Sequence, residues 1–307
     1  MGENPRKLHD LDAYTIIASD QKTQAIIIPE RGAWVASLVL PFKNGSREIL
    51  FQHNYAWDKT LNDLAGGVPF LFPICARIAR NNQDGVYLYD GKQYELKIHG
   101  FSWYEKWTVG EVTGNAIEMI LRDNQNTLLH YPFHFEVRLK YEVLPGKLLC
   151  HQFYKNNESV RAMPYYAGFH PYFLTPPEND GKEKVSLHFE STRRLKYNDT
   201  MTDIVDELPV LKTPISISSP DINEQLSVLG KNKSATLTFP DGDVIKIDMI
   251  ENSDYFPYLQ LYTIPEKPFF CVERWMGFPN ALNTVSGVRW LKAGMSESAV
   301  YEVSSTL

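Results

Sequence analysis

Hydrophobic and polar residues alternate with a period of two along much of the chain. In residues 135–143 the apolar positions alternate with Glu136, Arg138, Lys140 and Glu142. Because successive side chains of a strand point to opposite faces, this pattern predicts a strand with one buried and one solvent-facing surface. Related patterns predict further strands at residues 14–19, 24–29, 34–41, 116–122, 148–155, 185–189, 258–264 and 269–275.

Two additional strand pairs carry Asp-Gly at the point where the chain must reverse. Asp-Gly readily adopts the positive φ angles of tight hairpin turns. We therefore predict a first hairpin from strands 86–89 and 93–96, closed by Asp90-Gly91. A second hairpin is predicted from strands 235–239 and 244–249, closed by Pro240-Asp241-Gly242.

Helical patterns are scarce. Residues 55–65 could form a short helix, and the polar, proline-rich stretch 174–184 is typical of a surface loop. Strand patterns of the same kind continue on both sides of that stretch, which favours a single domain over residues 1–307. The sequence predicts an all-β fold, a large and mostly antiparallel β-sandwich with room for a cleft on one face.

Composition and charge narrow the classes of partner. The chain has 307 residues, of which 43% are hydrophobic and 22% charged, and a formal net charge of −6. It contains no run of five or more basic residues, so we expect neither nucleic acid nor a membrane surface as a partner. No apolar stretch approaches the 18 residues of a membrane helix. The pattern gives no indication of oligomeric state.

Cysteine usage and the first residues bear on the compartment. Cys75, Cys150 and Cys271 are far apart, odd in number and flanked by apolar residues, which favours reduced, buried thiols. Residues 1–19 are polar and lack the apolar core of a secretory signal. We expect a cytoplasmic protein.

Common cofactor and metal motifs are missing. The chain has no G-x-G-x-x-G, G-x-x-x-x-G-K-[ST], G-x-S-x-G or H-E-x-x-H. Only His130 and His134 have the four-residue spacing of a helical metal site, and Pro132 lies between them at the start of a strand. The sequence predicts neither a metal ion nor an organic cofactor.

Three short segments place an acid–base residue among aromatic residues, Gly and Pro. His99 precedes Gly100 after the first hairpin, and His170 lies in the aromatic stretch 165–173. Glu273 lies on the apolar strand 269–275, on the face that also carries Cys271. These are the candidate catalytic residues.

Each candidate has a structural alternative. A histidine among aromatic residues is more often a core residue, and Glu273 could form a buried ion pair with an arginine such as Arg77. A carboxylate on an apolar face is costly unless it is paired or functional. Burial would raise the pKa of Glu273, as a general base near neutral pH requires.

Taken in order, the segments resemble those of the aldose 1-epimerase (galactose mutarotase-like) family. The resemblance spans about residues 15–305, and its motifs are individually weak but lie in the correct order. The matching stretches are residues 26–40, 66–77 (GGVPFLFPICAR), His99-Gly100, His170-Pro171-Tyr172-Phe173, 258–263 (YLQLYT), Val272-Glu273, 279–283 and 291–294.

The resemblance implies a β-supersandwich and an enzyme that interconverts the α and β anomers of a free monosaccharide. It implies Glu273 as general base, His170 as general acid and His99 as a second histidine near the ring oxygen. Arg77 and Asp221 would bind substrate hydroxyl groups. A carboxylate and an imidazolium flanking the anomeric centre can open and close a sugar ring without a covalent intermediate.

Aromatic residues near these positions could stack on the sugar, although core packing is the alternative for each. They are Tyr166, Tyr172 and Trp275. One departure from the family pattern is Ala76, where a glycine is expected, which we interpret as a mild change.

Two other functions fit the same motifs. One is a hexose-6-phosphate 1-epimerase, for which Arg80 and Arg274 are candidate phosphate ligands, although a regular strand would point Arg274 away from the Glu273 face. The other is a non-catalytic carbohydrate-binding protein of the same fold.

Overall fold

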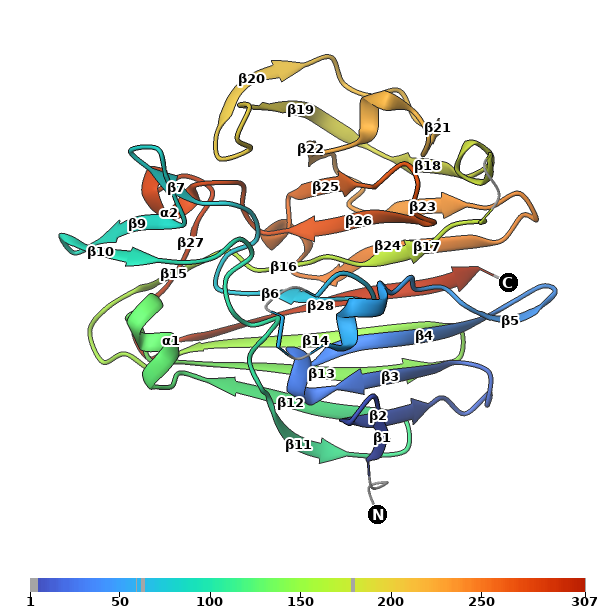
Figure 1. The fold of residues 1–307 in the computed structure, drawn as a ribbon, viewed down its shortest axis with the longest axis horizontal. Helices are drawn as coiled ribbons and strands as arrows, with labels where there is room; N and C mark the ends of the chain where they lie inside the picture. The colour runs from blue at the N-terminus through green and yellow to red at the C-terminus, as the bar shows by residue number, and fades with distance from the viewer. Residues whose placement is uncertain (1–4, 59, 62–63, 178–179, 307) are drawn as a thin grey trace.

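Three antiparallel sheets dominate the computed structural model, which describes residues 5–58, 60–61, 64–177 and 180–306 (Figure 1). Strands of the three sheets run mostly across the view, with the N-terminus at the bottom and the C-terminus at the right. The largest sheet has nine strands, in the spatial order β11 (Thr108–Val112), β12 (Ala116–Arg122), β13 (Phe135–Leu144), β14 (Lys147–Asn156), β28 (Ser296–Thr306), β24 (Val244–Glu251), β23 (Ala235–Thr238), β18 (Ser186–Phe189) and β21 (Ile215–Ser216).

The second sheet has eight strands and carries most of the residues discussed below. Its order is β20 (Ile204–Leu208), β19 (Ser191–Tyr197), β22 (Gln225–Leu229), β25 (Tyr258–Tyr262), β26 (Phe269–Trp275), β16 (Gly168–Phe169) and β6 (Phe70–Leu71), with β17 (Tyr172–Leu174) also paired to β26.

Smaller sheets complete the strand structure. The five-stranded sheet consists of β1 (Arg6–Leu8), β2 (Leu11–Ile17), β3 (Gln24–Ile28), β4 (Trp34–Phe42) and β5 (Gly45–Glu48). The two-stranded pairs are β7 (Ala79–Arg80) with β8 (Gln83–Asp84), β9 (Val86–Tyr89) with β10 (Lys92–Glu95), and β15 (Met163–Tyr165) with β27 (Arg289–Leu291).

Helices are short. The α-helices are α1 (Gln125–His130) and α2 (Ala281–Thr284), and single 3-10 turns occur at Pro29–Arg31, Asn54–Trp57, Gly181–Lys184, Pro220–Ile222 and Ser253–Tyr255. The helix predicted at 55–65 is wrong: its described residues form only the 3-10 turn, and 59, 62 and 63 lie outside the described residues. Among the described residues, no helix is long and apolar enough to cross a membrane.

The all-β, mostly antiparallel prediction is confirmed, and so are both Asp-Gly hairpins. Tyr89 pairs with Lys92 across the first turn, and Thr238 pairs with Val244 across the second. The alternating stretch beginning at Phe135 forms β13, which pairs along its whole length with β14. One hydrophobic cluster contains residues of all three large sheets, such as Leu38, Leu139 and Leu261.

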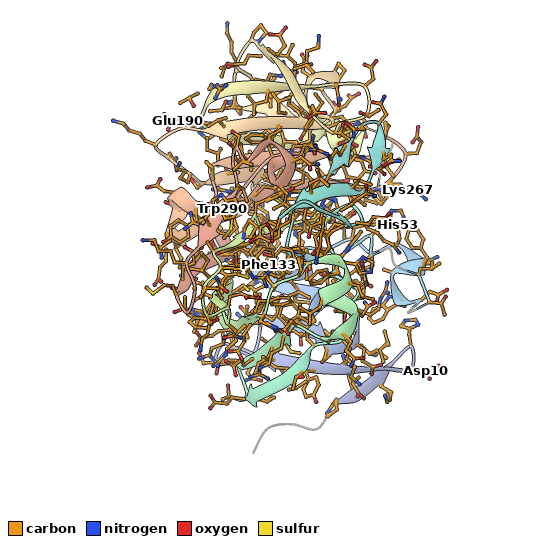
Figure 2. The ribbon with its side chains drawn as sticks, turned by 90° about the vertical axis from the view of Figure 1, so that its left-hand side faces the viewer. Asp10, His53, Phe133, Glu190, Lys267 and Trp290 are labelled. Carbon is orange, nitrogen blue, oxygen red and sulfur yellow. The ribbon has the colours of Figure 1, made fainter. Side chains whose placement is uncertain are left out.

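Figure 2 shows side chains filling the interior between the layers, with Asp10 and Glu190 at the outer edges. The fully buried core includes many aromatic rings, and Phe72 alone contacts the rings of Phe101, Tyr131 and Phe135. Such rings bury large apolar areas and hold the sheets in a fixed relation. That fixed relation gives the eight-stranded sheet a rigid base.

The pairing of β25 with β26 sets the position of the candidate base. Gln260 lies directly opposite Glu273, so both side chains point to the same face of the eight-stranded sheet. Tyr172, on β17, pairs with Cys271 on the other side of β26 and brings His170 to the same face. Leu261 and Val272 form the next pair and point to the opposite face, into the core.

Gly168 on β16 packs closely against β26. It pairs with Trp275, and a Cβ atom at Gly168 would lie 2.6 Å from Trp275 Cδ1 and 2.9 Å from Cys75 Cβ. Both neighbours are buried, so neither can move freely. We expect Gly168→Ala to lower the free energy of unfolding by about 1–3 kcal/mol, as measured by urea titration.

Gly114 provides a matched control. It is exposed, and a Cβ atom there would meet nothing within 4 Å. Gly114→Ala should change the free energy of unfolding by no more than about 0.5 kcal/mol. Equal effects of the two substitutions would contradict the close packing of Gly168 against Trp275.

Candidate functional site

A cavity of about 430 Å³, here called the inner cavity, lies over the face of β25 and β26 that carries Glu273. Its volume is typical of a site for a small molecule. The lining residues come from segments far apart in the sequence. They are Ala76, Arg77, Lys97, Ile98, His99, Trp103, His170, Tyr172, Tyr197, Met201, Glu224, Gln260, Tyr262, Glu273, Trp275 and Pro279.

Glu273 and His170 lie side by side in the wall of this cavity. The distance from His170 Nε2 to Glu273 Oε1 is 3.5 Å, and both side chains are buried. Glu273 is only 1% exposed. Within the described residues, the basic side chain in contact with its carboxyl group is thus a histidine and not Arg77, the arginine considered above.

Burial shifts the pKa values of the two groups in opposite directions. It raises the pKa of Glu273 well above the usual range, with the nearby Glu224 carboxylate adding to the rise and the Trp275 indole opposing it. It lowers the pKa of His170 to about 3. Loss of hydration disfavours the charged form of each group, which accounts for both directions.

Together these shifts mean that the pair holds one proton over a wide pH range. A second proton binds only when His170 is protonated next to a neutral glutamic acid, near pH 3. The single proton leaves only when Glu273 ionises next to a neutral histidine, which its raised pKa delays. A pair with one proton contains both a proton donor and a proton acceptor, as general acid–base chemistry requires.

His99 is held as a neutral hydrogen-bond donor. The backbone N–H of Ala76 donates to His99 Nδ1 over 3.0 Å, so Nδ1 carries no proton and the proton lies on Nε2. Burial lowers the pKa of His99 well below its usual value, with the neighbouring His170 and Arg77 adding to the effect. Its ring centroid lies 5.4 Å from that of His170.

The backbone around His99 has positive φ angles, which residues with a Cβ atom rarely adopt. Ala76 has φ +114° and His99 has φ +64°. Ala76 occupies the position where the resemblance predicts a glycine. Its positive φ explains why glycine is preferred there, so the replacement of glycine by alanine places a Cβ atom in an unfavourable backbone conformation and is not a mild change. Gly100 has φ +71° and could not carry a Cβ atom, which would lie 2.4 Å from the Phe72 carbonyl oxygen.

The part of the cavity around Gln260 is polar. Tyr197 donates to Gln260 Oε1 over 2.7 Å, and Gln260 Nε2 donates to Glu224 over 3.3 Å. Burial raises the pKa of Glu224, and the positive charge of Arg77 opposes the rise. Glutamate, glutamine and arginine side chains at one wall provide both donors and acceptors for hydroxyl groups.

Aromatic rings form the remaining walls. Tyr172 stacks on His170 with a centroid distance of 4.7 Å and an interplanar angle of 8°, while Trp275 lies edge-on to His99 at 5.9 Å. Tyr172 and Trp275 therefore line the cavity, whereas Tyr166 does not and is fully buried. Aromatic faces of this kind can pack on the apolar surface of a ligand.

The structure brings together five of the six predicted site residues and separates Asp221 from them. Asp221 is exposed in a 3-10 turn, where its carboxylate lies 3.6 Å from Arg194, and it does not line the inner cavity. Glu224, three residues later, faces the cavity instead. Arg274 is buried on the opposite face of β26, where it donates to the Phe256 carbonyl oxygen.

One group of potential metal ligands lies beside the cavity. His170, Cys271 and Glu273 have ligand atoms within 4.8 Å of one another. Cys271 does not line the inner cavity, and burial raises the pKa of its thiol well above the usual value, with Glu273 and Glu224 adding to the rise. Metal binding requires a thiolate, so the surroundings of Cys271 oppose it.

Several cavity residues were missed by the sequence analysis. Gln260 gave a signal that could have been used, because it is a polar residue between Leu259 and Leu261 on an apolar strand, and it shares its face with Tyr258 and Tyr262. Glu224 gave none: it precedes β22 in a turn with φ +50°, and only the folded chain brings it to the cavity.

Comparison with known proteins shows which family the chain belongs to. The family model described as aldose 1-epimerase matches residues 14–284. The chain belongs to the aldose 1-epimerase family. This confirms the resemblance inferred from the motifs.

Relatives of this aldose 1-epimerase family member include both sequences and solved structures. Protein LacX (chromosomal) of Lactococcus lactis subsp. lactis is 29% identical over 247 residues, which is 74% of this chain and 79% of the relative. A galactose mutarotase-like protein from Lactobacillus casei ATCC 334 has a TM-score of 0.77 at 27% identity, covering 96% of this chain and 100% of its own. The Slr1438 protein from Synechocystis sp. PCC 6803 shares the fold, with a TM-score of 0.81 at 24% identity over 100% of this chain and 98% of its own.

The protonation of His99 can be tested directly in this family member. We expect ¹⁵N NMR of the histidine side chains to show His99 as the Nε2–H tautomer, with no titration between about pH 5 and 8, since its Nδ1 accepts a hydrogen bond and burial lowers its pKa. The exposed His188 provides the control spectrum of an accessible imidazole. Titration of His99 near the ordinary histidine value of about 6.5 would contradict this assignment.

Proposed function

We propose that the protein is an aldose 1-epimerase that interconverts the α and β anomers of a free aldose. The observation that carries the proposal is the 3.5 Å contact between Glu273 and His170 in the wall of a polar and aromatic cavity. Opening a sugar hemiacetal needs one group that takes a proton and one that gives a proton, close to two oxygens on the same carbon. The pair supplies both.

Ring opening then proceeds as two proton transfers. The Glu273 carboxylate takes the proton of the O1 hydroxyl, the C1–O5 bond breaks, and His170 delivers its proton to O5. The product is the open-chain aldehyde, with a C1=O1 double bond and a hydroxyl group at C5. No bond forms between sugar and protein.

Ring closure reverses the roles after rotation about C1–C2. The C5 hydroxyl attacks the other face of the aldehyde, returns its proton to His170, and O1 takes the proton held by Glu273. The pair ends with the proton content with which it began. The same residues therefore serve both anomers, as a reversible reaction requires.

Substrate binding favours the reactive distribution of the proton. A hydroxyl group donating to Glu273 and a ring oxygen accepting from His170 stabilise the carboxylate and the imidazolium, respectively. Two opposite charges about 4 Å apart attract each other by about 4 kcal/mol at an effective dielectric constant of about 20, which offsets part of the cost of burial. The Nε2–H of His99 supplies a further donor, with Arg77 and Glu224 available to the other hydroxyl groups.

Removing the base should abolish most of the activity. We expect Glu273→Gln to lower kcat by about 10²- to 10⁴-fold, because an amide cannot accept the O1 proton. The measurement is the polarimetric decay of freshly dissolved α-glucose and α-galactose, with the buffer rate subtracted. Equal rates for the variant and the wild type would exclude Glu273 from the mechanism.

Glu251→Gln is the matched control for this substitution. Glu251 is exposed at the end of β24 and does not line the inner cavity, yet its replacement makes the same exchange of a carboxyl group for an amide. Its kcat should equal that of the wild type.

The pH dependence of kcat/KM should reflect the shifted pKa values of Glu273 and His170 and not those of a free glutamate and a free histidine. Activity needs one proton on the pair. Below about pH 3 the protonation of His170 gives the pair a second proton, and the proton acceptor is lost. Above the raised pKa of Glu273 the only proton of the pair leaves, and the proton donor is lost. We expect kcat/KM to stay flat through mildly acidic pH and to fall only on the alkaline side. The profile is measured over the range in which circular dichroism shows the fold intact, and a bell with limbs near about 4.3 and 6.5 would contradict the account.

A further inference from the structure

Two buried polar atoms at the inner cavity have no hydrogen-bond partner among the described residues. They are Oε2 of Glu273 and Nε1 of Trp275. One is an acceptor and the other is a donor, and both side chains line the cavity. Buried polar atoms without a partner are rare and costly in folded proteins. A matching donor and acceptor at one site therefore indicate an interaction that is completed in another protonation state.

Both side chains lie on the same face of β26. They are two positions apart on the strand, which places their Cα atoms about 6–7 Å from each other. An indole ring is long enough to span much of that distance. Burial raises the pKa of Glu273, and hydrogen bonding by the Trp275 indole opposes the rise. The donor and the acceptor are thus within reach of each other, although they do not form a full hydrogen bond here.

Packing holds the Trp275 ring in place. The ring lies edge-on to that of His99, with a centroid distance of 5.9 Å. A Cβ atom at Gly168 would lie 2.6 Å from Trp275 Cδ1, so the ring lies directly against β16. A donor that is already fixed loses little conformational entropy when it forms a hydrogen bond. The carboxyl group of Glu273, whose last torsion is broad, can turn to meet it.

Other donors close to Glu273 already have acceptors. His170 Nε2 faces Oε1, the other oxygen of the same carboxyl group. Tyr197 donates to Gln260 over 2.7 Å. The titratable groups that act on the carboxyl group from the surrounding elements are His170, Glu224, Tyr197, Tyr262, Cys75 and Cys271. All of them stay unchanged in the variant described below, so a change in the titration of Glu273 reports on Trp275.

We propose that Trp275 is a positioning residue for the general base. When Glu273 becomes a carboxylate, the indole Nε1–H donates to Oε2 and leaves Oε1, beside His170, to take the proton of the sugar O1 hydroxyl. A hydrogen bond to a charged acceptor is stronger than one to a neutral group, so the N–H favours the ionised base over the neutral acid. This inference rests on the proposed epimerase function and adds to it the group that stabilises the base.

An isosteric replacement removes the donor and keeps the ring. In Trp275→3-benzothienylalanine, here called the sulfur variant of Trp275, a sulfur atom takes the place of the N–H group. We expect kcat for glucose and galactose to fall by about tenfold to a hundredfold, with KM within about threefold of wild type, because the bond is strongest once the base has ionised. A kcat within about twofold of wild type would overturn the inference.

The pH profile separates this role from a loss of packing. The N–H lowers the pKa of Glu273, so its removal should raise that pKa and move the alkaline fall of kcat/KM to higher pH by about one pH unit. A variant that is only destabilised has no reason to move this limb upward. An alkaline limb at the wild-type pH, or at a lower pH, would contradict the proposal.

Trp107→3-benzothienylalanine is the matched control. Trp107 is buried and donates its N–H to the Ser102 carbonyl oxygen over 2.9 Å, but it does not line the inner cavity. The control therefore loses a buried hydrogen bond that does not involve Glu273. Its kcat should stay within about twofold of wild type, and its alkaline limb should not move. Equal effects of the two replacements would overturn the inference, because the loss of any buried indole N–H would then suffice.

A measurement without turnover distinguishes failure of this inference from failure of the proposed function. If the wild type epimerises no sugar, the proposed function fails, and the ionisation of Glu273 then decides the role of Trp275. The ionisation is followed by the ¹³C resonance of the Glu273 carboxyl carbon, assigned by its absence in Glu273→Gln. Ionisation at a higher pH in the sulfur variant of Trp275 than in wild type supports the inference, and ionisation at the same or a lower pH overturns it.

Discussion

The site depends on one buried contact, that between the carboxylate of Glu273 and the imidazole of His170. Neither charge is stable alone in an apolar sheet face, and each group changes the protonation of the other. Placing them 3.5 Å apart requires the register of β26 against β25 and β17, and the close packing of Gly168 against Trp275. The fold thus brings two titratable groups into contact at a buried position.

Much of the fold and part of the site could be predicted from the sequence, because the patterns that indicate them lie within short stretches of the chain. Period-two alternation gives the strands, and Asp-Gly gives the two hairpins. Glu273 was recognisable as a carboxylate on an apolar strand face. The helix at 55–65 was wrong, since a weak amphipathic pattern over a few residues does not ensure a helix. Glu224 could not be found, because its place in the cavity depends on a turn with positive φ and on contacts distant in sequence, and the motif match led to Asp221 instead.

The inner cavity combines groups of different kinds at one place. It holds the contact between Glu273 and His170, a histidine fixed as a neutral donor by the Ala76 N–H, and aromatic walls. Arg77 and Glu224 add charged groups to its lining.

A crystal structure of the protein with a bound aldose is the most direct test of the central claim. The account predicts the anomeric carbon at the Glu273–His170 pair, with O1 within about 2.6–3.2 Å of the Glu273 carboxylate and the ring oxygen within the same reach of His170 Nε2. A sugar bound in the inner cavity with its anomeric carbon facing away from the pair would contradict it, as would a pair that stays closed on itself and contacts neither oxygen.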